Sequence, residues 1–157
     1  MTDTAACIDN KLAFSTFRAL ISTSRLQDKK LQNALAGLDV HPAQYSCLFV
    51  ICEHEGVNLR QLAEGLHVEN STASVTVRRM EKAGFVIRLP DETDSRMARL
   101  YPTEYGRKQF EKSKRVIGEF INRCFGFLSE KEQRTLFQLL GKVSSKLEQY
   151  SFCSGQE

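Results

Sequence analysis

The chain has 157 residues, 41% hydrophobic and 26% charged, which excludes a disordered or fibrous protein and fits one domain with a substantial core. No stretch approaches the roughly 18 apolar residues of a membrane span, and residues 1–11 lack the pattern of a secretion signal, so we expect a cytoplasmic protein. The formal net charge of +3 is compatible with nucleic-acid binding, but many enzymes carry the same balance.

Two amphipathic helices are predicted in the first third of the chain. Over residues 8–37, apolar residues recur at steps of three, four and seven, with Gly37 as a plausible terminator. A second, buried helix over residues 42–54 begins with Pro42, which a helix tolerates in its first turn.

The middle of the chain predicts two short helices and a hairpin. The helices cover residues 59–66 and 71–83, and Gly84 is a suitable C-terminal stop. Two strands at 85–89 and 98–101 then flank a turn-rich, charged tip.

The last third is predicted to be helical again. Thr103 can cap one helix, and Ser129 with Glu132 forms a capping box before another. The expected order is four helices, a hairpin and two helices, which is a mainly α fold.

Residues 59–83 resemble a helix–turn–helix. Ala63 supplies the small residue needed where the second helix crosses the first, and Val68 is the apolar residue expected to be buried and to pin the turn. Ala73, Val77 and Met80 are spaced four and three apart, so they share a face that we expect to point into the core.

The opposite face of the helix over 71–83 suits the DNA major groove. Hydroxyls and the helix N-terminus can donate to phosphate, an apolar side chain can pack on a thymine methyl, and arginine can grip guanine or neutralise a phosphate. The alternative is an ordinary solvated helix face. The residues of this face are Ser71, Thr72, Ser74, Val75, Arg78 and Arg79.

The hairpin that follows directly makes the arrangement a winged helix, and its tip carries Asp94 and Arg96. Arginine at a loop tip suits a narrow minor groove, and we expect Asp94 to hold the Arg96 side chain extended through a charge-assisted bond. The alternative is an exposed turn with an incidental ion pair. Asp91 and Glu92 are expected to repel phosphate.

Residues 57–106 resemble the MarR family of transcriptional regulators. The resemblance rests on an Asp-x-Arg wing leading into a Leu-x-x-Thr-x-x-Gly helix start, matched here by Asp94, Arg96, Leu100, Thr103 and Gly106. It implies a homodimeric repressor of double-stranded DNA, binding a pseudo-palindromic operator and released in many members by a small ligand or an oxidant. It also implies one continuous domain, with a winged helix–turn–helix over 41–103 and dimerisation helices over 1–40 and 104–157.

Three residues depart from the family pattern. His67 stands in the turn where glycine is common, Val75 stands where a basic residue is frequent, and Pro102 replaces a more usual leucine. The first leaves the turn geometry open, and the second leaves the base preference open.

Apolar stripes in the first and last helices are the expected dimer interface, the alternative being internal packing of a single helical bundle. The interface residues are Ile8, Leu12, Leu136, Leu140, Val143 and Leu147. In similar proteins an effector pocket lies between the dimer helices and the DNA-binding lobe. Phe14, Phe17, Tyr45 and Phe49 are candidates to line one here, although such stripes are also typical of plain core.

The cysteines and histidines give no clear site. An odd cysteine count without a Cys-x-x-Cys pair speaks against a disulfide framework or zinc knuckle, and the histidines add no ligand spacing, so no metal or cofactor is expected. No nucleophile–base pattern, phosphate loop or paired acid motif indicates an enzyme. These residues are Cys7, Cys47, Cys52, Cys124 and Cys153, with His41, His54 and His67.

Two alternatives to a ligand-released repressor stay open. The first is a regulator switched by oxidation of a cysteine, although none of the five has an obvious neighbouring cation to lower its pKa. The second is a winged-helix protein–protein module without DNA binding, against which the basic, hydroxyl-rich face of 71–83 argues.

Overall fold

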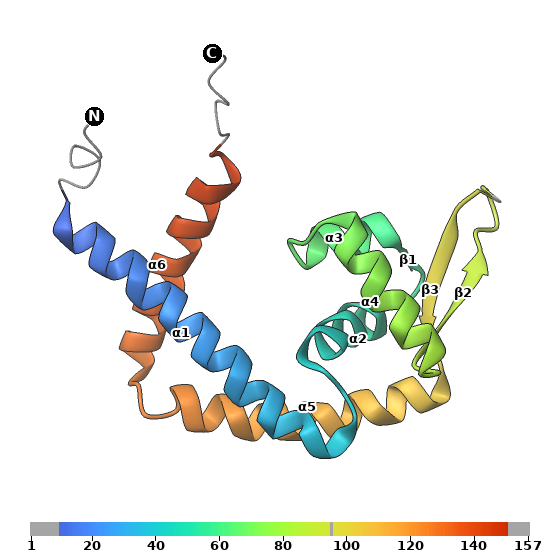
Figure 1. Ribbon diagram of the computed structural model, residues 1–157, viewed down its shortest axis with the longest axis horizontal. Helices are drawn as coiled ribbons and strands as arrows, with labels where there is room; N and C mark the ends of the chain where they lie inside the picture. Colours follow the sequence, from blue (N-terminus) through green and yellow to red (C-terminus); the bar gives the residue numbers. More distant parts are fainter. Residues whose placement is uncertain (1–9, 95, 151–157) are drawn as a thin grey trace, which may run out of the picture. The chain divides into compact units, whose positions relative to one another are not determined.

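The computed structural model describes residues 10–94 and 96–150. They form six α-helices, one short 3-10 helix and a three-stranded antiparallel sheet, as expected for the predicted mainly α winged helix (Figure 1). The elements are α1 (Lys11–Leu35), η2 (Ala36–Leu38), α2 (Pro42–Glu53), β1 (Val57–Asn58), α3 (Leu59–Gly65), α4 (Asn70–Lys82), β2 (Val86–Pro90), β3 (Ala98–Pro102), α5 (Glu104–Phe125) and α6 (Glu130–Glu148). The chain divides into two compact units, with the boundary between Ile117 and Gly118.

The start of α1 is fixed by Asn10, whose Oδ1 accepts from the backbone N of Ala13 at 2.9 Å. Its end differs from the prediction. The α-helix stops at Leu35 and tightens into η2, and the left-handed residue that turns the chain is Asp39, with φ of 52°, rather than Gly37. Asparagine and aspartate tolerate this conformation better than other side chains, which is why the turn does not need the glycine. None of the described helices is long and apolar enough to cross a membrane.

The sheet has the strand order β1-β3-β2. The hairpin pairs Val86 with Pro102 at its base and Pro90 with Ala98 near its tip, within one residue of the predicted strands. The prediction missed β1, a strand of two residues in which Val57 pairs with Leu100. A strand this short has no alternation that a sequence pattern can register, so only its partner reveals it.

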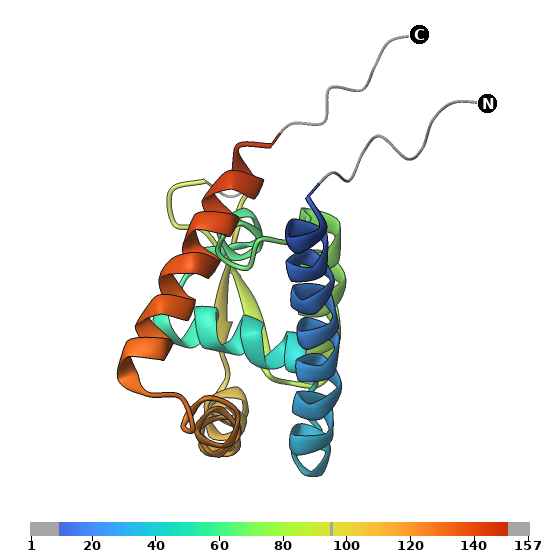
Figure 2. The ribbon, with the colours of Figure 1, turned by 90° about the vertical axis from the view of Figure 1, so that its left-hand side faces the viewer.

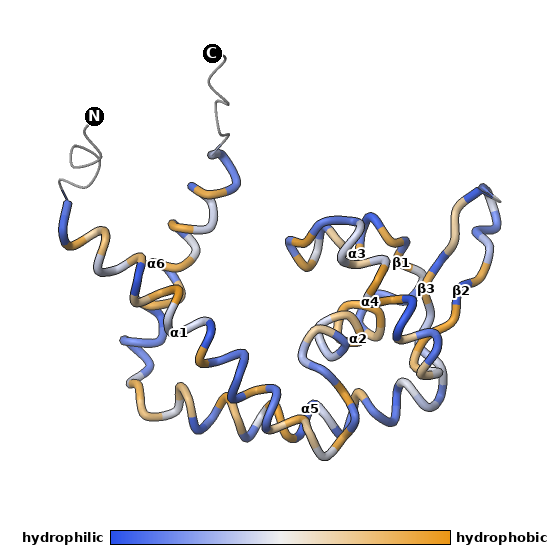
Figure 3. Tube along the Cα trace, viewed as in Figure 1, coloured by the Kyte–Doolittle hydropathy of each residue, from blue (hydrophilic) through white to orange (hydrophobic). Residues whose placement is uncertain are grey.

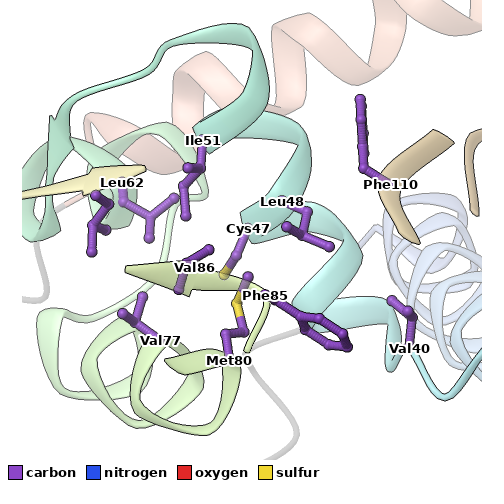
Figure 4. Close-up of a cluster of buried hydrophobic side chains, with 11 residues drawn as sticks. Val40, Cys47, Leu48, Ile51, Leu62, Val77, Met80, Phe85, Val86 and Phe110 are labelled. Carbon is purple, nitrogen blue, oxygen red and sulfur yellow. The ribbon is translucent and has the colours of Figure 1, made fainter. Parts of the chain in front are cut away.

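The core of the first unit lies between α2, α3, α4 and the hairpin (Figure 4). Figure 4 shows Cys47 from α2 and Met80 from α4 directed into this core, near Val86 of β2. Leu48, Ile51, Leu62, Val77 and Met80 are all fully buried. This packing fixes the position of α4 against the rest of the unit, because its buried face is shared with two helices and a strand.

The joint between the hairpin and α5 explains the Leu-x-x-Thr-x-x-Gly pattern. Leu100 is buried in the core, and the Thr103 hydroxyl caps α5 by accepting from Gly106 N at 2.9 Å while donating to Gly84 O at 2.6 Å. A Cβ on Gly106 would lie 1.9 Å from Phe85 O, so only glycine allows α5 this close to the start of the hairpin. The motif therefore fixes the packing of α5 against the start of the hairpin.

The second unit contains the end of α5 and the whole of α6. Figure 2 shows α6 as one unbroken helix. The predicted capping box is confirmed: Ser129 Oγ accepts from Glu132 N at 3.4 Å, and Ser129 N donates to Glu132 Oε2 at 2.8 Å. No residue of α6 is buried, although apolar segments alternate with polar ones along it (Figure 3).

Candidate nucleic-acid interface

Helix α4 has the two faces that the sequence predicted. Ala73, Val77 and Met80 are buried, while Val75 on the other side is 47% exposed. Ser71, Thr72, Arg78 and Arg79 are exposed as well, and Ser74 is half-buried at the margin. The helix therefore presents hydroxyls, one valine and two arginines to the outside from a rigidly packed base.

The N-terminus of α4 carries free donors. Its N-cap residue is Glu69, which makes no side-chain cap bond within the described part of the chain. The amides of Asn70, Ser71 and Thr72 have no intrahelical acceptor because they lie in the first turn of the helix, and the Glu69 side chain does not accept from them either. Together with the helix dipole, free amides of this kind form an anion-binding end that suits a phosphate.

The two arginines of α4 are not engaged elsewhere. Among the described residues, neither Arg78 nor Arg79 forms an ion pair, whereas Arg88 on β2 pairs with Glu81 at 3.0 Å. Unpaired guanidinium groups on a major-groove-sized helix are available for a base edge or a phosphate.

The turn before α4 shows that the predicted burial of Val68 is wrong, and it explains the glycine preference at position 67. Val68 is 40% exposed and does not fill the core; with Cys47, Ala73 and others it lines a cavity of about 180 Å³. Its backbone pins the turn instead, because Val68 N donates to Ala63 O at 3.0 Å. His67 adopts a positive φ of 51°, which accounts for the preference for glycine at its position in the family pattern.

The tip of the hairpin presents Arg96 as an exposed side chain. The predicted bond from Asp94 to the Arg96 guanidinium is wrong: Asp94 Oδ1 accepts from the backbone N of Arg96 at 3.0 Å. A carboxylate two residues before a backbone amide closes a tight Asx turn more readily than it reaches a long side chain. Asp94 therefore shapes the loop and does not orient the guanidinium.

Asp91 is not the phosphate-repelling tip residue that the sequence suggested. It is 8% exposed and forms an ion pair with Arg99 of β3, and its neighbour Glu92 remains exposed. Bonds from Thr93, Arg99 and Asp94 hold the pKa of Asp91 well below its usual range. The ionised form of Asp91 therefore stabilises the hairpin fully at pH values above the usual pKa of a carboxyl group. This contribution is lost as the pH falls through the lowered pKa. The signal for this pair in the sequence is weak, because it consists of an acid and a base eight positions apart across a loop.

The aromatic residues proposed for an effector pocket fall into two groups. Tyr45 stacks on Phe110 with ring centroids 5.8 Å apart, and Phe49 meets the same ring edge-on at 6.2 Å. Phe14 and Phe17 on α1 are 41% and 59% exposed. A pocket lined by all four stays a prediction.

The proposed dimer residues that the structure describes are exposed within a single chain. Leu12 is 76% exposed, and on α6 the exposed fractions run from 37% at Leu136 to 65% at Leu147, with Leu140 and Val143 between them. Ile8 lies outside the described residues. Such a row of exposed leucines on one helix face is typical of a surface that another chain covers.

Two of the described cysteines, Cys47 and Cys52, lack the lowered pKa of a reactive thiol. Burial raises the pKa of the Cys47 thiol to about 11 and also raises that of Cys52. Cys124 is exposed, and Cys7 and Cys153 lie outside the described residues. Within residues 10–94 and 96–150, no group of three or more His, Cys, Asp or Glu side chains could hold a metal ion.

Comparison with known proteins gives consistent matches to one family. A model of the MarR family matches residues 40–97. The chain is 35% identical over 133 residues to the HTH-type transcriptional regulator YybA of Bacillus subtilis, covering 83% of each chain. It is 28% identical over 141 residues to the organic hydroperoxide resistance transcriptional regulator of the same species, covering 90% of each.

Solved structures agree with this fold. A MarR mutant from E. coli complexed with operator DNA matches with a TM-score of 0.76 and 26% identity, covering 80% of this chain and 91% of that one. A MarR protein from Peptoclostridium difficile matches with a TM-score of 0.81 and 26% identity, covering 92% of each chain.

Proposed function

The chain belongs to the MarR family of transcriptional regulators, and we propose that it is a homodimeric repressor that binds a pseudo-palindromic operator and is released by a small ligand. The observation that carries the proposal is the outer face of α4, where free amides, hydroxyls and two unpaired arginines stand on a fully packed base. The hairpin tip adds a further exposed arginine, Arg96. Its function is regulation of transcription and not catalysis.

We assign the individual contacts by chemistry. The N-terminus of α4, with Ser71 and Thr72, binds phosphate. Ser74 reaches a base edge or phosphate, Val75 packs on a thymine methyl and Arg78 binds guanine through O6 and N7. Arg79 neutralises a phosphate, and Arg96 enters the minor groove next to the major groove that α4 occupies. Asp94 shapes the loop that carries Arg96.

Replacing Arg78 or Arg96 by alanine tests these assignments. We expect Arg78→Ala to bind the operator about five- to a hundredfold more weakly, since a bidentate base contact is worth about 1–3 kcal/mol. Arg96→Ala should also bind more weakly, because it loses the contact with the minor groove. Only Arg78→Ala should also relax base preference at one position in each half-site. The measurement is fluorescence anisotropy with DNA that the wild-type protein selects from a random-sequence pool, followed by a second selection with Arg78→Ala.

Arg134→Ala is the matched control, because it removes the same charge from the exposed polar side of α6, where Arg134 pairs with Glu130. Its affinity should stay within about twofold of wild type, since a surface pair of this kind contributes little. Unchanged binding by both Arg78→Ala and Arg96→Ala would remove the groove assignments.

The operator symmetry follows from the proposed dimer. One winged domain reads only a few base pairs, so two copies on two half-sites gain both affinity and specificity. We propose that the stripe of Leu136, Leu140, Val143 and Leu147 on α6, with Leu12 on α1, forms the two-fold interface. The exposure of these residues in one chain supports this role.

The effector site is proposed at the aromatic group around Phe110. Tyr45 and Phe49 pack on this ring, and the side-chain oxygens of Gln109 and Ser113, next to it on α5, are buried without a hydrogen-bond partner in the described residues. Buried polar atoms without partners are costly unless something else satisfies them. A small aromatic ligand with one polar group matches this chemistry, and Phe14 and Phe17 would complete its lining from α1.

A further inference from the structure

A continuous chain of polar contacts runs from the turn before β1 to the tip of the hairpin. Arg99 Nη1 donates to Gly56 O at 3.0 Å, and Arg99 Nε donates to Asp91 Oδ2. The other oxygen of this carboxylate, Oδ1, accepts from Asp94 N at 3.0 Å. Asp94 Oδ1 in turn accepts from Arg96 N at 3.0 Å. Two side-chain carboxylates and one guanidinium thus link the body of the unit to the backbone of the wing arginine.

The tip end of this chain is closely constrained. Asp91 Oδ1 also accepts from the backbone N and the hydroxyl of Thr93, at 2.8 and 2.7 Å. Backbone bonds close the same loop, from Asp91 N to Met97 O and from Met97 N to Asp94 O, each at 2.9 Å. A carboxylate that accepts four hydrogen bonds and is 8% exposed holds its surroundings in one arrangement.

The other end is anchored to the centre of the sheet. Gly56 N donates to Leu100 O at 3.0 Å, and Leu100 lies in the core on β3. Gly56 has a φ of 81°, and a Cβ there would lie 3.1 Å from the Tyr101 hydroxyl, so the turn depends on glycine. The guanidinium of Arg99 is therefore held between a fixed carbonyl and the loop.

We propose that Asp91 and Arg99 are positioning residues that hold the hairpin tip in the shape from which Arg96 enters the minor groove. The inference rests on the proposed function, since it presumes that Arg96 contacts DNA. An arginine on a free loop must order that loop on binding and loses affinity to the entropy cost, whereas a pre-shaped loop does not. Asp91 contributes without touching DNA, and because its carboxylate is buried and paired with Arg99 it does not repel phosphate.

A double-mutant cycle between Asp91→Asn and Arg96→Ala tests this role. We expect Asp91→Asn alone to weaken operator binding about tenfold, the effect of losing a hydrogen bond to a charged group. In the Arg96→Ala background the same change should weaken binding by less than about twofold, because the side chain being positioned is gone. Both single variants should lose the preference for A·T over G·C pairs in the flanking minor groove, measured with two fragments that differ only there.

Arg99→Gln is the second variant, because it removes the link to Gly56 but leaves the bonds from Thr93 and Asp94 to Asp91 in place. Its loss of operator affinity should likewise be non-additive with that of Arg96→Ala. The positioning role can therefore still be tested if Asp91→Asn unfolds the protein. Arg107→Gln is the control: it breaks the 2.7 Å ion pair with Glu55, next to Gly56 but outside the chain of contacts, and should change affinity by less than about twofold.

The outcomes separate the inference from the proposed function. Effects of Asp91→Asn and Arg99→Gln that multiply with that of Arg96→Ala, or wild-type affinity in both variants, would overturn the positioning role while leaving DNA binding intact. Wild-type affinity in Arg96→Ala itself would contradict the wing assignment in the proposed function, and the positioning role with it. Absence of operator binding by the wild-type protein would contradict the proposed function.

Discussion

Leu140→Asp should convert the protein to a monomer and reduce operator affinity at least about a hundredfold, the scale of the gain from joining two binding units. Leu140 is 41% exposed in one chain and sits in the middle of the apolar stripe of α6. In a two-fold interface the substitution places two carboxylates in an apolar surface without partners, which is costly. Multi-angle light scattering gives the oligomeric state, and anisotropy gives the affinity.

Gln138→Asp is the matched control for Leu140→Asp. It adds the same charge to the same helix, but position 138 lies about 160° around α6 from position 140, on the polar side. This variant should remain dimeric and bind as wild type. A dimeric Leu140→Asp with unchanged affinity would show that the stripe on α6 is not the interface.

Gly106→Ala should destabilise the fold by at least about 3 kcal/mol, at the upper end of overpacking effects. The added Cβ would lie 1.9 Å from Phe85 O and 2.8 Å from Phe85 C, and both are backbone atoms that cannot rotate away. The first turn of α5 must therefore move off the hairpin, which also disturbs the Thr103 cap. Chemical denaturation followed by circular dichroism measures the loss.

Gly118→Ala is the comparison for Gly106→Ala because it lies on the same helix with no neighbouring atom within 4 Å of the added Cβ. Alanine should stabilise α5 there by about 0.5–1 kcal/mol, as expected at an open helix interior. Equal stability of Gly106→Ala and wild type would mean that the close approach of α5 to Phe85 is not required.

The helices and the hairpin could be predicted from the sequence because each carries a local signal. The stripe of Ala73, Val77 and Met80, the stop at Gly84 and the capping box at Ser129 all act within one or two turns of chain. Interactions between distant segments could not be predicted in this way. β1 exists only through its pairing with β3, and Arg99 contacts Gly56 across 43 positions of sequence.

The errors at the candidate site have a common cause. Residue type and position alone mispredict the roles of Val68, Asp91 and Asp94, because in each case a backbone bond or a buried partner decides the role. The exposed residues of α4 were easier, because a helix that buries one face must expose the other. Their contacts with DNA, like the dimer interface, involve a second molecule and remain predictions.

The central claim, that this chain is a sequence-specific DNA-binding repressor, is tested most directly by anisotropy with a labelled fragment from upstream of its own gene. A fragment of equal length and shuffled sequence serves as the reference, at two salt concentrations. We expect tight binding to the first fragment that weakens steeply with salt, and affinity for the shuffled fragment at least about a thousandfold lower. Failure to bind either fragment at low salt would contradict the claim and favour a protein–protein module.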